Sequence, residues 1–285
     1  MIEKNKRRDI MFFNGIAVIS LVLTAVGYIA GIYEALWAIP VAFIVLFIGV
    51  LLLWAVSGII VTRFINMNKE CSKFNPIYGF YTHCVICLVM QYLRIKMHIT
   101  GKEILPKEKF LFVCNHRGAM DPLVTMGVLR KYNMGFVAKK ELFEIPVISR
   151  LMHSRFCLSL NRGDVKDSAK TILRAGEIIK NDLASMGIYP EGTRNHEDEM
   201  LPFMHGAFKI AKKAECPIVV ATIRNTEHIM KNAPFKRTHV YLDYIGVISK
   251  EVVAENTTVA LSNMAREMME EHMKKDVGKW QKTMQ

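Results

Sequence analysis

A histidine and an aspartate, five residues apart, stand directly after an apolar run. His116 follows residues 110–114, and Asp121 precedes Pro122, where a helix is expected to begin with Asp121 as its cap. A tight turn containing Gly118 brings the carboxylate back onto the imidazole. A carboxylate on one ring nitrogen fixes the tautomer and leaves the other nitrogen able to take a proton. The spacing therefore predicts a general base.

The motifs that the sequence lacks narrow what this base acts on. No GxSxG segment offers a serine nucleophile. Neither GxGxxG nor GxxxxGK[ST] occurs, which removes the usual arguments for dinucleotides and nucleoside triphosphates. A hydroxyl group of the substrate itself remains as the group to be deprotonated.

A second unusual segment, GIYPEGTRN at residues 187–195, ends another apolar run. Pro190 and Gly192 shape a turn, Glu191 places a carboxylate in it, and Arg194 offers a forked cation that suits phosphate. The alternative is an ordinary surface turn with an Arg–Glu pair. The presence of the histidine segment in the same chain favours the phosphate-binding interpretation.

Together the two segments resemble the glycerolipid acyltransferase family, especially the 1-acylglycerol-3-phosphate acyltransferases. The family's NHxxxxD block is matched by Asn115, His116 and Asp121, and its EGTR block by residues 191–194. Its proline-centred apolar strand corresponds to CPIVVAT, with Pro217 as the marker. The resemblance implies that the histidine and aspartate are the catalytic residues.

A further family block survives only in part as FCLSLNRGD. Arg162 fits its arginine, whereas Asn161 stands where aspartate is common and Ser159 where an aromatic residue is common. This departure puts the identity of the acceptor in doubt. The segment VAKKEL around Lys139 also fits, and the resemblance covers about residues 95–247.

The resemblance implies transfer of an acyl group from a thioester, on coenzyme A or acyl carrier protein, to lysophosphatidic acid, without a metal or redox cofactor. The substrate-binding residues that it implies are Glu191, Gly192, Thr193, Arg194, Arg162 and Lys139. For Lys139 a solvated pair with Lys140 is an equal alternative. The acceptor alternatives are glycerol-3-phosphate and other lysophospholipids. A non-catalytic lipid-binding membrane protein is the alternative of a different class.

Short apolar runs that alternate with helical patterns from residue 95 onward predict an α/β fold, with a largely parallel sheet flanked by helices. The expected strands are 95–99, 110–114, 135–138, 157–160, 187–189, 218–223 and 239–247. The expected helices are 122–131, 169–181, capped by Asp167 or Ser168, 208–214 and 258–282. Ligands of such folds bind at the loops that follow the strands.

The N-terminal region is apolar, since Glu34 is the only charged residue in 10–62. Residues 10–33 and 35–62 each exceed the roughly 30 Å of a bilayer core, which predicts a two-helix membrane hairpin. A cleaved leader or an interfacial hairpin is the alternative. Lysines and arginines flank the hairpin and are missing from its turn, so both ends, and the catalytic domain, are expected on the cytoplasmic side of the membrane.

We expect three parts: a membrane anchor at 1–62, a connecting membrane-proximal segment at 63–94 and a catalytic domain at 95–285. Residues 74–93 are also uncharged, but they contain Pro76 and His83. A surface or core helix is therefore favoured over a third span.

Charge and cysteine content limit the partners. The chain carries a net charge of +12, of which residues 63–285 supply +11. This surplus suits anionic lipid, an acidic carrier protein or phosphorylated small molecules, and no nucleic-acid-binding motif occurs. Among six cysteines only Cys84 and Cys87 have ligand-like spacing, so we expect packed free thiols and no metal.

Overall fold

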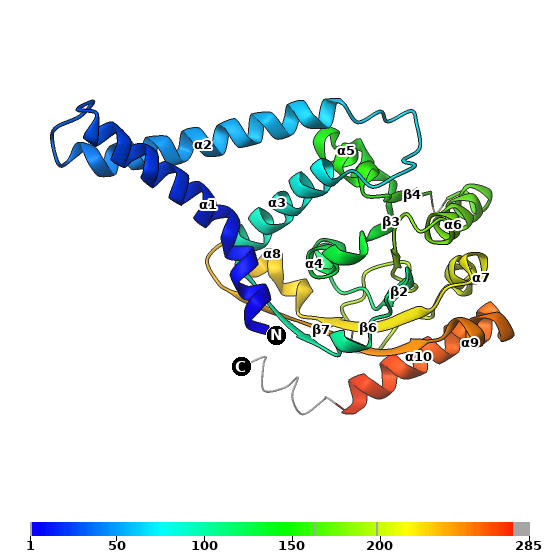
Figure 1. Cartoon of the computed structure of the whole chain (residues 1–285). Coiled ribbons are helices and arrows are strands. Elements are labelled where there is room, and N and C mark those ends of the chain that lie inside the picture. Colours follow the sequence, from blue (N-terminus) through cyan, green and yellow to red (C-terminus); the bar gives the residue numbers. More distant parts are fainter. Residues whose placement is uncertain (1, 162, 198, 276–285) are drawn as a thin grey trace.

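A seven-stranded sheet forms the centre of the protein, whose computed structural model describes residues 2–161, 163–197 and 199–275, with side chains from residue 14 (Figure 1). The strands are β1 (Ile95–Thr100), β2 (Leu111–Cys114), β3 (Gly135–Lys139), β4 (Leu158–Leu160), β5 (Met186–Ile188), β6 (Ile218–Arg224) and β7 (Thr238–Ile248). Their order is β1-β7-β6-β2-β5-β3-β4, and only β6 and β7 pair antiparallel. The predicted α/β class and mostly parallel sheet are confirmed.

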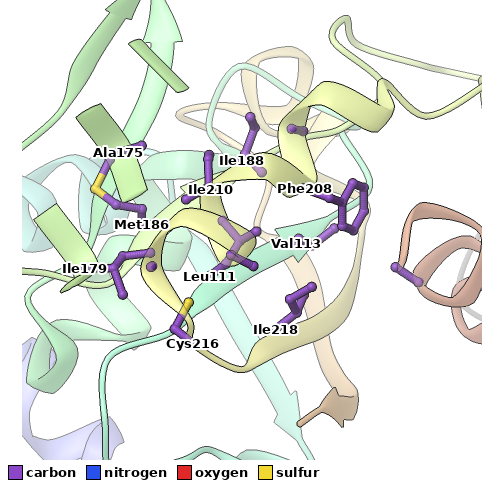
Figure 2. Close-up of a cluster of buried hydrophobic side chains, with 14 of the residues drawn as sticks. Leu111, Val113, Ala175, Ile179, Met186, Ile188, Phe208, Ile210, Cys216 and Ile218 are labelled. Atoms are coloured by element: carbon purple, nitrogen blue, oxygen red, sulfur yellow. The ribbon is translucent and has the colours of Figure 1, made fainter. Parts of the chain in front are cut away.

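Strand β2 shows why these apolar runs become central strands. Successive side chains of a strand point to opposite faces, so Leu111 and Val113 enter one hydrophobic core while Phe112 and Cys114 enter the other. All four side chains are fully buried. Figure 2 shows Leu111 and Val113 in the first core. A strand covered on both faces reads as a continuous apolar run rather than an alternating one.

Helices cover both faces of the sheet (Figure 1). On one face lie α6 (Val165–Lys180), α7 (Lys209–Ala214) and α10 (Thr258–Lys275), whose apolar side chains complete the core of Figure 2. On the other face lie α3 (Pro76–Tyr92) and α4 (Asp121–Val128).

Shorter helices that the sequence patterns did not predict complete the domain. They are α5 (Pro146–Ser154), α8 (Ile229–Asn232) and α9 (Lys250–Glu255), with 3₁₀ turns at Lys102–Ile104, Arg130–Tyr132, Lys140–Glu144, His205–Phe208 and Thr226–His228. The expected helix 122–131 thus divides into α4 and a 3₁₀ turn. The expected extension of α10 to residue 282 lies partly outside the described residues.

Two of the expected helix caps are wrong. Helix α4 begins at Asp121 itself, after Met120 as N-cap, because the Asp121 carboxylate bonds elsewhere. Helix α6 begins at Val165, four residues earlier than expected. Asp164 is its N-cap, and its side chain accepts from two backbone N–H groups of the first turn, which neither Asp167 nor Ser168 does.

The first two helices extend away from the sheet (Figure 1). Helix α1 (Ile2–Ile29) packs against α2 (Ala38–Arg63), which largely exposes its apolar side chains. Within the described side chains, α2 is the one helix long and apolar enough to cross a membrane, and 14–29 forms a shorter apolar stretch. Apolar surface on this scale calls for a lipid or protein partner. The predicted divisions after residues 62 and 94 stay predictions.

Helix α3 corresponds to the uncharged segment 74–93. Its N-cap Asn75 accepts from the backbone of the first turn, and Pro76 occupies the first helical position. One face, including Cys84 and Cys87, is buried, and the helix contacts α4 and α5. Neither cysteine forms a disulfide with a described residue, and burial raises the pKa of Cys84 to about 11. With 17 residues, α3 is shorter than the roughly 20 residues of a typical span.

Candidate active site

His116 and Asp121 form the pair that their spacing predicts. Nδ1 of His116 lies 2.7 Å from Oδ2 of Asp121, and their side chains are 16% and 0% exposed. The same carboxylate oxygen accepts the backbone N–H groups of Arg117, at 2.7 Å, and Gly118, at 2.9 Å. Three donors on one oxygen hold the carboxylate in place. Because Nδ1 donates to Asp121, Nε2 carries the lone pair, and no described residue bonds it.

Gly118 is required by a close contact rather than by an unusual backbone angle. A Cβ at this position would lie 2.7 Å from the carbonyl oxygen of Thr226 in the loop after β6. The turn between His116 and Asp121 therefore fits closely against the neighbouring strand end. A side chain there would push the two loops apart.

Asn115 fixes the start of the loop. Its side-chain amide donates to the carbonyl of Ile223 at 3.0 Å, and its oxygen accepts the Ile223 N–H at 2.8 Å. The side chain is buried and takes the place of a backbone group in the ladder between β2 and β6. Asn115 thus positions the backbone from which His116 projects.

Glu191 joins the two motif segments. Its Oε1 accepts the backbone N–H of His116 at 2.8 Å, and its Oε2 accepts that of Leu201 at 3.2 Å. The residue is only 5% exposed. The carbonyl of His116 in turn accepts the N–H of Asn195 at 2.8 Å. Both backbone groups of the histidine are therefore held by the segment that contains EGTR.

Gly192, Thr193 and Arg194 complete that turn. Gly192 has φ +72°, the left-handed region that favours glycine, and a Cβ there would meet Met204 at 2.6 Å. Thr193 and Arg194 are exposed, and among the described residues neither has an ion pair or hydrogen bond through its side chain. An Arg–Glu surface pair is absent from this part of the structure, since Glu191 bonds backbone groups instead. Arg194 has no side-chain partner among the described residues, and it directly precedes Asn195, whose N–H bonds the carbonyl of His116.

Two other expected substrate-binding residues have different outcomes. Arg162 lies outside the described residues. Lys139 ends β3 and pairs with Glu141, with 2.9 Å between Nζ and Oε1. Both side chains of this pair are more than half exposed, as in the solvated interpretation.

Tyr189 is a site residue that the sequence patterns did not identify. Its ring stacks on the imidazole of His116, with the centroids 4.4 Å apart and the planes 18° apart. The ring of Phe136 also stacks on that of Tyr189, with the ring centroids 5.7 Å apart. Burial raises the pKa of the Tyr189 phenol well above its ordinary value, with Asp121 adding to the effect, so the phenol stays protonated. The only hint in the sequence is an aromatic residue at the strand end before PEGTR.

Arg117, the residue after His116, links two neighbouring loops through its side chain. Its guanidinium lies 2.9 Å from Oε1 of Glu227 and donates to the carbonyl of Glu197 at 2.6 Å. Burial alone raises the pKa of Glu227, but the hydrogen bond and charge of Arg117 outweigh it and lower that pKa. The side chain next to His116 thus ties the loop after β5 to the loop after β6.

The arrangement suits proton abstraction next to an anion. The motif residues follow the carboxyl ends of β2 and β5, which are neighbours in the sheet. The described residues contain no cluster of three His, Cys, Asp or Glu side chains that could hold a metal ion. What the site offers is an oriented imidazole, an exposed guanidinium and the backbone that links them.

Comparison with known proteins agrees with this geometry. Residues 96–224, which include both motif segments, match the family model described as Acyltransferase. The 1-acyl-sn-glycerol-3-phosphate acyltransferase of Bacillus subtilis is 34% identical over 148 residues, 50% of this chain and 69% of that protein. The protein of that name from Saccharomyces cerevisiae is 25% identical over 67% of this chain. The chain belongs to this acyltransferase family.

The fold is also found in a solved structure. The 1-acyl-sn-glycerophosphate (LPA) acyltransferase PlsC of Thermotoga maritima is 17% identical, with a TM-score of 0.57 over 95% of this chain and 97% of that one. At this identity the likeness concerns the fold alone. The matched part of this chain spans 64% of the yeast relative and 39% of a chloroplast relative from Brassica napus.

Proposed function

We propose that the protein is a membrane-attached O-acyltransferase that moves a fatty acyl group from an acyl thioester to the free hydroxyl of lysophosphatidic acid, giving phosphatidic acid. The observation that carries the proposal is the 2.7 Å contact between Nδ1 of His116 and Oδ2 of Asp121, which leaves Nε2 as the proton acceptor. The names of the relatives, all 1-acyl-sn-glycerol-3-phosphate acyltransferases, support the choice of substrate.

The reaction has two proton transfers through one imidazole. Nε2 of His116 takes the hydroxyl proton as the acceptor oxygen attacks the thioester carbonyl carbon. The tetrahedral intermediate then collapses, the carbon–sulfur bond breaks, and the imidazolium returns the proton to the leaving thiolate. Asp121 stabilises the imidazolium between these steps. General base catalysis of this kind contributes about 10²–10⁴-fold in rate.

The phosphate of the acceptor is assigned to Arg194. Its guanidinium is exposed, has no described partner and lies in the turn that binds the backbone of His116. A forked cation binds a phosphate through two parallel hydrogen bonds. A phosphate bound to Arg194 would hold the acceptor hydroxyl near Nε2 of His116. Such positioning lowers the activation barrier, because the translational and rotational entropy of the acceptor is lost on binding rather than in the chemical step. Arg162 is a second candidate by sequence alone.

The type of acyl donor is inferred from the net charge, and attachment to the membrane from the exposed apolar surface. The net charge of +11 over residues 63–285 favours an acidic donor, either acyl-CoA or acyl carrier protein, and anionic lipid. The exposed apolar helix α2 is assigned to the membrane, with the sheet on the cytoplasmic side. No metal or redox cofactor takes part in this scheme.

One assay separates the alternatives. The full chain in nonionic detergent is incubated with radiolabelled acyl-CoA or acyl carrier protein thioester, and with lysophosphatidic acid, lysophosphatidylcholine or glycerol-3-phosphate. We expect labelled phosphatidic acid and little transfer to the other acceptors. Preferred transfer to another acceptor would reassign the substrate. Binding of lysophosphatidic acid without any product would favour the non-catalytic lipid-binding alternative and contradict the proposal.

A further inference from the structure

Arg155 is a buried arginine without a counter-ion. It follows α5, is 5% exposed, and forms no ion pair with a described acidic residue. Its Nε is buried, and no described residue accepts a hydrogen bond from it. A charged group loses much of its hydration free energy when it is buried, and without a partner of opposite charge nothing offsets this loss. Such a group therefore points to a partner of opposite charge.

The protein groups around Arg155 offset only part of that cost. Its Cζ lies 5.2 Å from the ring centre of Phe74, an arrangement that favours a cation. Its Nη1 packs against Gly79 of α3, where an added Cβ would be 3.5 Å away. The ring of Phe74 is partly exposed, so this contact replaces water poorly. Neither group supplies a negative charge.

A second arginine faces the same place. Arg130, in the 3₁₀ turn that follows α4, lines a small cavity together with Arg155, and no described acidic residue pairs with it. Burial is the main cause that lowers the pKa of Arg155 to about 10, and the charge of Arg130 adds to it, so the Arg155 guanidinium is charged at neutral pH. The repulsion between two like charges is relieved by an anion between them.

The cavity lies where α3, α4 and α5 meet. Besides the two arginines, it is lined by Gly79, Thr82, His83 and Ile86 of α3 and by Met126 of α4, and no described acidic side chain lines it. Its volume of ≈ 10 Å³ accommodates about one water molecule or one small ion. An organic ligand does not fit.

We propose that Arg155 and Arg130 form an anion-binding site that takes a halide or one oxygen of a phosphate and fastens α3 to α4 and α5. The phosphate is either a free ion or part of a lipid headgroup beside α3. Two apolar side chains of α3, Ile77 and Phe80, are exposed and could contact such a lipid. The site is separate from the catalytic pair. Arg155 precedes β4, at the amino end of the parallel strands, whereas His116 follows the carboxyl end of β2.

Thermal unfolding of the full chain in nonionic detergent tests the site without using activity. The melting temperature is measured at one pH and ionic strength in sodium gluconate, chloride or phosphate. A second arm uses phosphatidylcholine vesicles with and without phosphatidylglycerol. An anion at ten times its dissociation constant should raise the melting temperature by about 3 °C.

The variants connect the shift to the residues. Arg155→Met should remove the anion-dependent rise, and Arg130→Met should reduce it by at least half. Arg237→Met, which removes an exposed arginine elsewhere, should keep it. If Arg155→Met fails to fold, the Arg130→Met protein tests the proposal instead. The Arg130 side chain is exposed, so its replacement should not prevent folding.

A rise in chloride or phosphate identifies a free ion, and a rise only with phosphatidylglycerol identifies a headgroup. No rise in either arm overturns the proposal, as does a rise that persists unchanged in Arg155→Met or Arg130→Met.

Discussion

The backbone N–H of His116 donates to the carboxylate of Glu191 at 2.8 Å, which joins two segments that lie 75 residues apart in the chain. The same carboxylate accepts the N–H of Leu201. A buried carboxylate with two backbone donors acts as a structural link between loops. We therefore assign Glu191 a positioning role rather than direct contact with the acceptor.

Glu191→Gln tests this assignment. The amide can accept from only one of the two backbone donors, so the other is left unsatisfied at a cost of about 1–3 kcal/mol. We expect a lower melting temperature and a lower kcat, with KM for the acceptor nearly unchanged. Unfolding curves and steady-state kinetics measure both. A raised acceptor KM with unchanged stability would instead place Glu191 in contact with substrate.

Tyr189→Phe and Tyr189→Leu separate the ring from its hydroxyl. The phenylalanine keeps the stack on His116, so kcat should stay within about twofold. The leucine loses an aromatic contact of about 0.5–1.5 kcal/mol, which corresponds to a fall of roughly two- to thirteenfold in kcat if the stack holds the imidazole in its reactive orientation. The pH–rate profiles of both variants complete the measurement. Equal activity in Tyr189→Leu would show that the stack does not orient the base.

Arg194→Ala tests the phosphate contact. Loss of a charge-assisted, two-bond contact of about 1.5–3 kcal/mol should raise KM for lysophosphatidic acid by about 10- to 100-fold, while KM for the thioester stays the same. Arg237→Ala, which also removes an exposed arginine, is the matched control. If only the donor KM rises, the acceptor phosphate binds elsewhere.

Asp243 predicts a pH dependence of stability. Burial raises the pKa of this carboxyl, but hydrogen bonds from Thr100 and Arg224, with the Arg224 charge, outweigh it and lower the pKa. Because the pKa is lower in the folded state, Asp243 stabilises the fold above the unfolded pKa of about 4. That contribution is lost as the pH falls through the folded value.

Asp243→Asn should therefore destabilise the protein at pH 7 by about 3 kcal/mol, since it breaks the buried ion pair in which Nη2 of Arg224 lies 2.8 Å from Oδ2 of Asp243. The difference from the unchanged protein should shrink below about pH 4. Glu255→Gln, an equal charge change on the exposed face of α9, serves as the control. A constant difference between pH 3 and pH 7 would contradict the assignment.

The sequence predicted the sheet and the contact between His116 and Asp121 well for physical reasons. Strands buried on both faces stand out as short apolar runs, and β2 is such a run, so its end at Cys114 and the position of His116 were readable. The Asp121 carboxylate reaches His116 within one turn, which makes the contact local. Local geometry of this kind depends little on the rest of the fold.

Contacts between distant segments were not predictable in the same way. The stack of Tyr189 on His116 requires β5 to lie beside β2, although β3 and β4 come between them in the chain. The N-caps of α4 and α6 were not predictable either, because each depends on which nearby polar side chain bonds the first helical turn and which bonds another group in the folded protein. Arg155 gave no sign of burial, because arginines are usually exposed.

The most direct test of the central claim is the rate of acyl transfer by His116→Ala, measured with lysophosphatidic acid and a radiolabelled acyl thioester. His153→Ala, which removes a histidine in the last turn of α5, is the control. The melting temperature shows that each variant is folded. We predict a fall in kcat of at least about 10²-fold for His116→Ala and no comparable change for His153→Ala. A folded His116→Ala protein that retains full activity would contradict the account.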